Sequence, residues 1–269
     1  MTAAPALRPA AVAGLFYPAS DTTLRATVQH LLDAAPSAPT PRAPRAPRAL
    51  IVPHAGYVYS GAAAAAAYRV LAAWPQHYTR AVVLGPPHRR AVRGIASVSV
   101  SAFDGPLGRV RIDRTALDDA LARSAVVVDD AAHAEEHAIE VQLPFLQTLL
   151  GDFSLVPLLV GAQAAARTAE LLAPWWDAPD TLIVVSTDLS HFLDYDGAQR
   201  LDAATDAMIC ALDARGLTPE HACGCHALGG LLHLARARRA RIERVALCNS
   251  GDTAGPRDRV VGYGAYVLD

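Results

Sequence analysis

Long hydrophobic runs and an excess of basic charge are both missing from this 269-residue sequence. Lysine and arginine number 24 against 26 aspartates and glutamates, which gives a formal net charge of −2. Proteins that bind nucleic acids or anionic membrane surfaces normally carry a basic excess, so neither partner is expected. The apolar stretch at residues 10–17 is interrupted by Gly14 and followed by Pro18. It is too short for a membrane span, which needs about 20 apolar residues, or for a secretory signal.

Cysteines are also few, and their spacing does not suggest a disulfide framework. The chain has four, at positions 210, 223, 225 and 248, so that Cys223 and Cys225 are separated by one residue. In a chain without a secretion signal, such thiols are expected to be reduced. We therefore predict a cytoplasmic location.

Apolar, β-branched runs alternate with helix-like stretches along most of the chain. Strands are expected at Ala49–Pro53, Ala81–Gly85, Ile95–Val100, Phe153–Val160, Thr181–Ser186, Arg244–Cys248 and Val260–Leu268. Helices are expected at Ala62–Trp74 after a cap at Ser60, and at Ile139–Leu150, Ala164–Trp175, Ala198–Leu212 and Leu228–Ala237. This alternation predicts one α/β domain over residues 1–269, with a largely parallel central sheet flanked by helices. The Pro/Ala/Arg tract at 36–47 is expected to be an extended surface loop.

Residues with site chemistry follow several of the predicted strands. His54 and His88 come directly after two of them, Asp188 and His191 follow a third, and Cys248 ends a fourth. Ligands of open parallel sheets bind where the carboxyl ends of the strands converge. Two imidazoles, a thiol and an Asp/His pair are therefore expected at one edge of the sheet. One histidine after a strand is usually a hydrogen-bonded loop residue, but four such strand ends together favour a functional site.

Imidazole and thiolate ligands suit zinc, copper or iron. Three protein ligands from His54, His88 and Cys248 would leave coordination positions open for water, oxygen or substrate. Asp188 and His191 could then orient a ligand or move protons.

Several segments resemble the Memo family, whose bacterial members are called AmmeMemoRadiSam system protein B. They are VAGLFYP at 12–18, PHAGYVYSG at 53–61, LGPPH at 84–88, EEHAIEVQLPFL at 135–146, STDLSH at 186–191, CGCHALGGLL at 223–232 and the segment around Cys248. The match runs over nearly the whole chain. It implies a fold similar to that of LigB-type extradiol dioxygenases, which hold non-haem iron.

The resemblance also implies roles for individual residues. The family's metal ligands match His54, His88 and Cys248, and its neighbouring acid and histidine match Asp188 and His191. An aromatic residue over the pocket matches Phe16, where many relatives carry tryptophan. Ring-cleaving dioxygenases use two histidines and a carboxylate, whereas a thiol takes the third place here. A thiolate donates more charge to iron and is itself oxidisable, so ring cleavage does not follow from the resemblance.

Three other patterns suggest different chemistry and are disfavoured. His133 to His137 spells H-x-x-E-H, a metalloprotease pattern, but that pattern needs a distant third ligand, and Pro144 follows too closely for a long uninterrupted helix. The pair Cys223 and Cys225 has one intervening residue, whereas paired zinc ligands usually have two to four. Ser190 and His191 are adjacent, so their side chains diverge and cannot form a hydrolytic triad.

The leading hypothesis is a metal-dependent oxidoreductase that uses iron(II), with copper second and zinc third. Asp188 and His191 would handle protons, and four residues would shape the substrate pocket: Phe16, Tyr57, Glu136 and His137. The alternatives are a binding or adaptor protein that holds a peptide or small anion in the same pocket, and a zinc hydrolase with Asp188 as its base. The family name suggests functional association with radical-SAM and AMMECR-type proteins.

Overall fold

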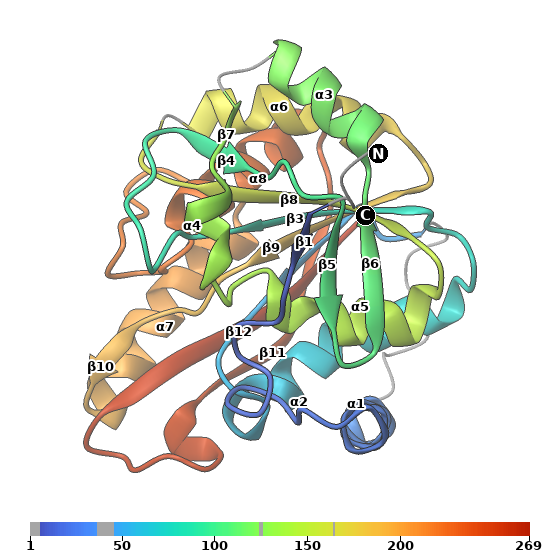
Figure 1. Cartoon of the computed structure of the whole chain (residues 1–269). Coiled ribbons are helices and arrows are strands. Elements are labelled where there is room, and N and C mark those ends of the chain that lie inside the picture. Colours follow the sequence, from blue (N-terminus) through green and yellow to red (C-terminus); the bar gives the residue numbers. More distant parts are fainter. Residues whose placement is uncertain (1–5, 37–45, 124–125, 164) are drawn as a thin grey trace.

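The computed structural model describes residues 6–36, 46–123, 126–163 and 165–269, so most of the Pro/Ala/Arg tract lies outside the described residues. Within these ranges a large mixed sheet runs through the molecule, with helices on both faces (Figure 1). The strand order along the main path is β1-β5-β6-β8-β3-β9-β2-β12-β10. No described helix combines the length and apolar character that are needed to cross a bilayer.

The centre of the sheet consists of four parallel strands. They are β8 (Ser154–Val160), β3 (Arg80–Gly85), β9 (Thr181–Ser186) and β2 (Ala49–Val52). Nearly every residue in them is buried, as expected for strands that are covered on both faces. The predicted α/β class with a largely parallel sheet is therefore confirmed.

Further strands extend this centre on both sides, by antiparallel pairing around β12 and by both parallel and antiparallel pairing beyond β8. On one side, β12 (Val260–Leu268) pairs with β2, with β11 (Ile242–Asn249) and with β10 (His191–Leu193). On the other, β6 (Gly108–Ile112) joins β8 and forms a hairpin with β5 (Ala102–Gly105), which pairs with β1 (Leu7–Arg8). The short strands β4 (Ile95–Ser97) and β7 (Val126–Val128) pair with each other, and β4 also joins β8.

Helices α1 (Asp21–Ala34), α2 (Tyr57–Tyr68) and α5 (Leu143–Leu150) lie together on one face of the sheet (Figure 1). Helices α6 (Ala165–Asp177), α7 (Tyr195–Cys210) and α8 (Cys225–Ala237) lie on the other. Two more helices, α3 (Arg114–Arg123) and α4 (Asp130–Ala134), belong to the part of the chain between β6 and α5. Small residues allow close packing: a Cβ at Gly61 of α2 would stand 2.9 Å from Leu31 Cδ1 of α1.

Several predicted helix starts differ from the structure. Helices α7 and α8 each begin three residues before the expected start, at Tyr195 and Cys225. The helix expected from Ala62 begins at Tyr57, and its N-cap is Gly56 rather than Ser60. The Ser60 hydroxyl instead donates to the Ala55 carbonyl at 2.9 Å. The helix expected over 139–150 begins as a short 3-10 turn at Glu140–Gln142, and α5 follows with Pro144 in its first turn. Proline has no N–H to donate, so the first turn is where a helix tolerates it.

Candidate metal centre

His54 leaves the carboxyl end of β2 and is held on two sides. Its backbone N–H donates to Asp188 Oδ1 at 2.7 Å, and its Nδ1 lies 2.9 Å from Ser186 Oγ. The Ser186 hydroxyl donates to the Ala138 carbonyl at 2.6 Å and accepts from Gln142 Nε2 at 2.8 Å. Since that hydroxyl has one proton, all partners are satisfied when His54 carries its proton on Nδ1. The Nε2 lone pair is then free to bind a ligand.

His88 follows β3 and is fixed by one buried carboxylate. Its backbone N–H donates to Glu136 Oε2 at 2.5 Å, and its Nδ1 lies 2.9 Å from Glu136 Oε1. The same oxygen accepts the backbone N–H groups of His137 and Ala138 at 2.8 and 2.9 Å. Burial favours a raised pKa for Glu136, but the imidazoles of His137 and His88 and the backbone donors lower it far below its ordinary value. An ionised Glu136 therefore orients His88 so that Nε2 is left free.

Cys223 lies in the turn before α8, close to the end of β9. Its thiol accepts from the Asp188 N–H at 3.3 Å, and the Gly224 N–H donates to Thr187 Oγ1 at 2.8 Å. A Cβ at Gly224 would stand 2.7 Å from Thr187 Cβ, so glycine is required for this approach. The Cys223 Sγ consequently lies 3.4 Å from His54 Nε2.

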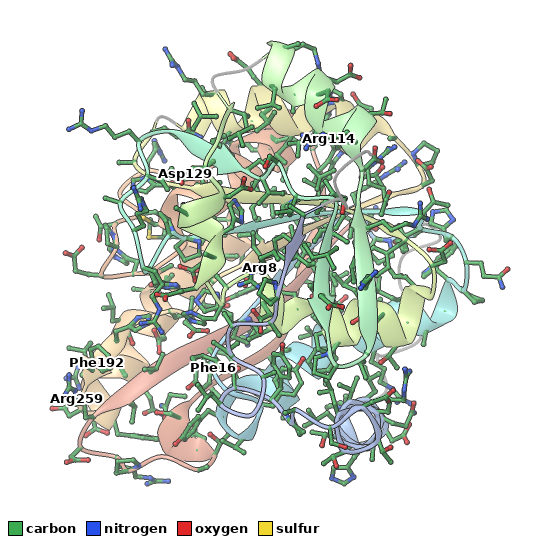
Figure 2. The ribbon with its side chains drawn as sticks, viewed as in Figure 1. Arg8, Phe16, Arg114, Asp129, Phe192 and Arg259 are labelled. Atoms are coloured by element: carbon green, nitrogen blue, oxygen red, sulfur yellow. The ribbon has the colours of Figure 1, made fainter. Side chains whose placement is uncertain are left out.

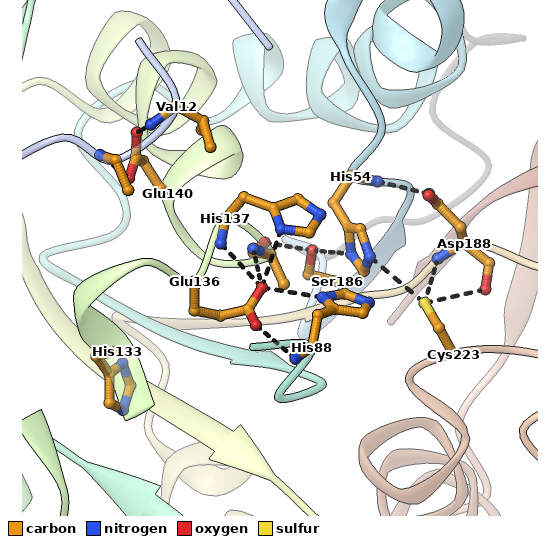
Figure 3. A network of polar contacts seen from close by, with 12 residues as sticks. Val12, His54, His88, His133, Glu136, His137, Glu140, Ser186, Asp188 and Cys223 are labelled. Carbon is orange, nitrogen blue, oxygen red and sulfur yellow. Dashed lines mark hydrogen bonds and ion pairs between the residues drawn. The ribbon is translucent and has the colours of Figure 1, made fainter. Parts of the chain in front are cut away.

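The ligand atoms of His54, His88 and Cys223 all lie within 4.8 Å of one another. Figure 3 shows the two imidazoles and the thiol gathered beside Glu136 and Asp188. With bonds of about 2.1 Å to nitrogen and about 2.3 Å to sulfur, ligands of one metal ion lie at most about 4.4 Å apart. A small side-chain rotation would close the remaining gap, so these three residues fit a first-row metal ion.

The prediction that Cys248 supplies the sulfur is corrected by this geometry. Cys248 lies near the end of β11, opposite Tyr263 of β12. The described residues form two groups of potential metal ligands, His54 with His88 and Cys223, and His88 with Glu136 and His137, and Cys248 belongs to neither. Strand β11 runs parallel to β2, and both strands therefore end at the same edge of the sheet. However, β12 lies between them, which places Cys248 two strand spacings, or about 10 Å, to the side. The thiol at the centre is Cys223.

Burial sets the protonation of the centre in the absence of metal. The pKa of His54 lies well below its ordinary value because of burial and the neighbouring imidazoles of His88 and His137. Burial, followed by the charge of Asp188, raises the pKa of the Cys223 thiol to about 12. A metal ion would thus meet a neutral imidazole with a free lone pair, and it would displace the thiol proton when it bound.

Asp188 and His191 both lie close to His54. Asp188 is buried, and this burial raises its pKa even though the His54 N–H and several imidazoles favour the charged form. His191 is half-buried, and its Nδ1 lies 2.8 Å from the Leu189 carbonyl. A carbonyl can only accept, so His191 carries its proton on Nδ1 and leaves Nε2 as a potential base.

The four residues that were predicted to shape the pocket differ in burial: Phe16 and His137 are half-buried, whereas Tyr57 and Glu136 are buried. The Phe16 ring lies 4.6 Å from the His137 ring, which stacks on His88 at 4.7 Å between ring centroids. His137 Nδ1 lies 3.1 Å from Glu136 Oε1, but it forms no hydrogen bond among the described residues. Tyr57 is in the core, where its hydroxyl donates to the Val141 carbonyl at 2.7 Å. Phe16 and His137 therefore lie beside the His88 ring, Glu136 holds that ring and Tyr57 is in the core, and a substrate-binding role for the four residues stays a prediction.

The three disfavoured patterns do not form sites of their own in the described residues. Helix α4 ends at Ala134, so His133 and His137 do not share a helix, and His133 Nε2 instead contacts the Ala96 carbonyl at 3.1 Å. Cys225 opens α8 and is buried, outside both groups of potential metal ligands. Ser190 Oγ is buried without a hydrogen-bond partner within the described ranges.

Comparison with known proteins gives the family of this chain. The family model described as Memo-like protein matches residues 8–267. The chain belongs to the Memo family. A MEMO1 family protein from Methanopyrus kandleri is 36% identical over 280 residues, which cover 97% of this chain and 98% of that protein. A second MEMO1 family protein, from Archaeoglobus fulgidus, is 33% identical over 96% of this chain and 97% of its own length.

One solved structure has a fold similar to that of this Memo family protein. The crystal structure of an uncharacterized protein from Escherichia coli K12 aligns with a TM-score of 0.50 and 15% sequence identity, covering 80% of this chain and 98% of that one. At this identity the likeness concerns the fold alone. It agrees with a single α/β domain built around one large sheet.

Proposed function

We propose that this Memo family protein is a metal-dependent oxidoreductase, with iron(II) as the favoured metal and copper as the second. The observation that carries the proposal is that His54 and His88 each have a polar partner at Nδ1. Ser186 lies beside Nδ1 of the first imidazole and Glu136 beside Nδ1 of the second. Both Nε2 atoms are thereby left free beside the Cys223 thiol. Such outer partners are typical of metal-binding histidines.

The kind of ligand and the access of solvent to the cluster both support redox chemistry. Two imidazoles and one thiolate suit iron and copper as well as zinc, and they leave coordination positions free. The His88 side chain is 28% exposed, so the cluster opens to solvent on that side. A bound iron or copper ion would supply one-electron chemistry at these positions. Hydrolysis at zinc with Asp188 as the base has weaker support, because the Asp188 carboxylate is buried and accepts from the His54 N–H.

His191 is the residue best placed to move protons. Its Nδ1–H is committed to the Leu189 carbonyl, and its Nε2 lone pair is free to accept a proton from a substrate. Asp188 holds the His54 backbone, and the nearby His191 imidazole favours the charged form of the Asp188 carboxyl. In this scheme Phe16 and His137 hold the substrate, and the protein supplies orientation and a proton acceptor.

A binding or adaptor role is the second candidate, favoured by exposed apolar residues that adjoin the site in sequence. Leu15 next to Phe16 is 81% exposed, and Phe192 next to His191 is 60% exposed. The Arg259 guanidinium lies 4.3 Å from the centre of the Phe192 ring, and Figure 2 shows this pair at the periphery of the molecule. Large exposed apolar side chains often mark surfaces that contact a partner.

Oxygen consumption by the metal-loaded, reduced protein distinguishes the two roles. For the oxidoreductase, turnover with a panel of reduced organic substrates should exceed that of free metal, and His191→Ala should lower it about 10²–10⁴-fold. Metal content should not change in this variant, because His191 is not a ligand. His30→Ala, which alters an exposed histidine of α1, is the matched control and should leave turnover unchanged. Wild-type consumption no higher than that of free metal, together with retained binding of a peptide or anion, would favour the adaptor role.

A further inference from the structure

A pocket lies at the opposite end of β2 from the candidate metal centre. It has a volume of about 490 Å³, within the range of small-molecule sites. Charged side chains dominate its lining: Arg48, Asp177, Arg238, Arg239, Arg241 and Asp269. In Figure 1 the C end of β12 lies far from β10, which carries His191. Arg48 and His54 flank β2, and six residues of extended chain span about 20 Å, so the two sites are separate.

Most of the arginine charge in this pocket has no carboxylate partner. Arg238 pairs with Asp177 at 2.6 Å. For Arg48, Arg239 and Arg241, no ion pair occurs within the described residues, although Arg48 Nη1 donates to the Ala178 carbonyl at 3.3 Å. Residues 37–45 lie outside the described residues, but their sequence contains no aspartate or glutamate. The neighbouring tract therefore cannot neutralise the three free guanidinium groups.

The local backbone brings these arginines together. Helix α8 ends at Ala237, and Arg239 has a φ of +54°, in the left-handed region that usually requires glycine. The Ala240 N–H donates back to the Ala235 carbonyl at 2.9 Å, and this turn leads the chain into β11. Arg241 then faces the end of β12, where the Asp269 N–H donates to its carbonyl at 3.2 Å. A tight turn thus gathers three arginines within four residues beside Arg48.

Helix electrostatics alone do not account for this concentration of charge. Cations stabilise the last turn of a helix, but the C-terminal end of a helix is equivalent to only about half a negative charge. One arginine is sufficient for that purpose. The pocket also holds arginines from two separate parts of the chain, since Arg48 precedes β2 whereas the others follow α8.

We propose that this pocket binds a small phosphate-bearing molecule. Guanidinium groups present planar forks of N–H donors that match phosphate oxygens in bidentate geometry. Three such groups without carboxylate partners, in a pocket of small-molecule size, favour a ligand with at least two negative charges. The lining does not suit a metal cation, because its arginines outnumber its two carboxylate side chains by four to two.

Calorimetric titration of pyrophosphate into the full chain tests this assignment. The protein is first stripped of metal with a chelator, which excludes binding through an ion at His54 and His88, and the buffer is free of phosphate. We expect saturable binding that weakens as salt is raised, because ionic contacts are screened. Arg241→Gln and Arg239→Asn should each weaken binding about 10- to 100-fold, the usual effect of losing a hydrogen bond to a charged group. Asparagine at 239 tolerates the left-handed backbone.

Arg109→Gln is the matched control, because Arg109 is an exposed arginine of the β5–β6 hairpin and its side chain is 62% exposed. It should bind pyrophosphate like the wild type, and adenosine, which lacks phosphate, should not bind. Circular dichroism melting should confirm that all three variants fold. The proposal is overturned if pyrophosphate gives no heat at millimolar concentration, or if Arg241→Gln and Arg239→Asn bind it unchanged. It is also overturned if His54→Ala abolishes binding, because the anion would then lie at the metal centre.

Discussion

The Sγ of Cys223 lies 3.4 Å from Nε2 of His54, although 169 residues separate them in sequence. Both atoms are held by the same short segment after β9. The Asp188 carboxylate accepts the His54 N–H, and the Asp188 N–H donates to the Cys223 thiol. Asp188 therefore joins the two ligands through its side chain and its backbone. This arrangement brings together candidate metal ligands from a strand end and a turn that lie far apart along the chain.

Replacing Glu136 with glutamine should loosen His88 without removing a metal ligand. The carboxylate accepts four N–H groups, including both those of His88, whereas an amide would direct its own N–H₂ at some of these donors. Loss of an outer partner typically lowers metal affinity about 10- to 100-fold. Cobalt(II) titration should show this loss for Glu136→Gln. The neighbouring Glu135→Gln should bind cobalt like wild type because Glu135 is exposed, and similar affinities in the two variants would contradict the assigned role.

Acid stability should depend on His133. Burial lowers its pKa from 6.5 to about 4, against the favourable contact with the Ala96 carbonyl. Between these values the unfolded chain binds a proton that the folded chain does not, so stability falls as pH falls from 6.5 to 4. The shift corresponds to roughly 3 kcal/mol. In urea unfolding at several pH values, His133→Gln should lose stability less steeply than wild type over this window. His54, whose pKa is also lowered, should maintain part of the slope in both proteins.

A buried ion pair anchors the N-terminal segment to the turn that carries Glu136. Arg8 pairs with Glu140, and its guanidinium also donates to the His133 and Glu136 carbonyls. Both side chains of the pair are 4% exposed. Arg8→Met would leave Glu140 charged and unpaired, so it should lower the free energy of unfolding by about 3–5 kcal/mol.

The surface pair on α1 provides the comparison for Arg8. Arg25 lies 2.5 Å from Asp21, and the two side chains are 58% and 52% exposed. Solvent screens such a pair, so Arg25→Met should change stability by about 0.5 kcal/mol or less. Denaturant unfolding measures both variants. Equal losses would show that the buried pair does not contribute as argued.

The edge of the sheet that carries the site was predictable from sequence. His54, His88 and Asp188 follow buried runs, and the carboxyl ends of parallel strands must meet at one edge. The lateral order of the strands was not predictable, because no local pattern indicates that β12 separates β11 from β2. The sequence therefore predicts Cys248 at the same edge as His54, and in the structure the two residues are separated by β12. The signal for Cys223 was the glycine that follows it, which permits its close approach to Thr187.

Other differences between the predicted and the observed elements also arise from contacts between residues far apart in sequence. The start of α2 was assigned to a Ser60 cap, which is a local signal, whereas the helix begins at Tyr57, whose N–H donates to the Phe16 carbonyl at 2.8 Å. The β5–β6 hairpin and β10 were not predicted. Strand β10 has three residues and is defined by its pairing with β12. Strands of this length carry too little periodicity to be recognised without their partners.

Metal content after anaerobic purification tests the central claim most directly, with Cys223→Ser, Cys225→Ser and Cys248→Ser measured beside wild type. A serine hydroxyl does not ionise readily at neutral pH and is a poor ligand for iron or copper. Elemental analysis should show close to one metal ion per chain in wild type, Cys225→Ser and Cys248→Ser, and a strong loss in Cys223→Ser, with all four proteins folded. Retention of metal by Cys223→Ser together with its loss from Cys248→Ser would contradict the centre described above.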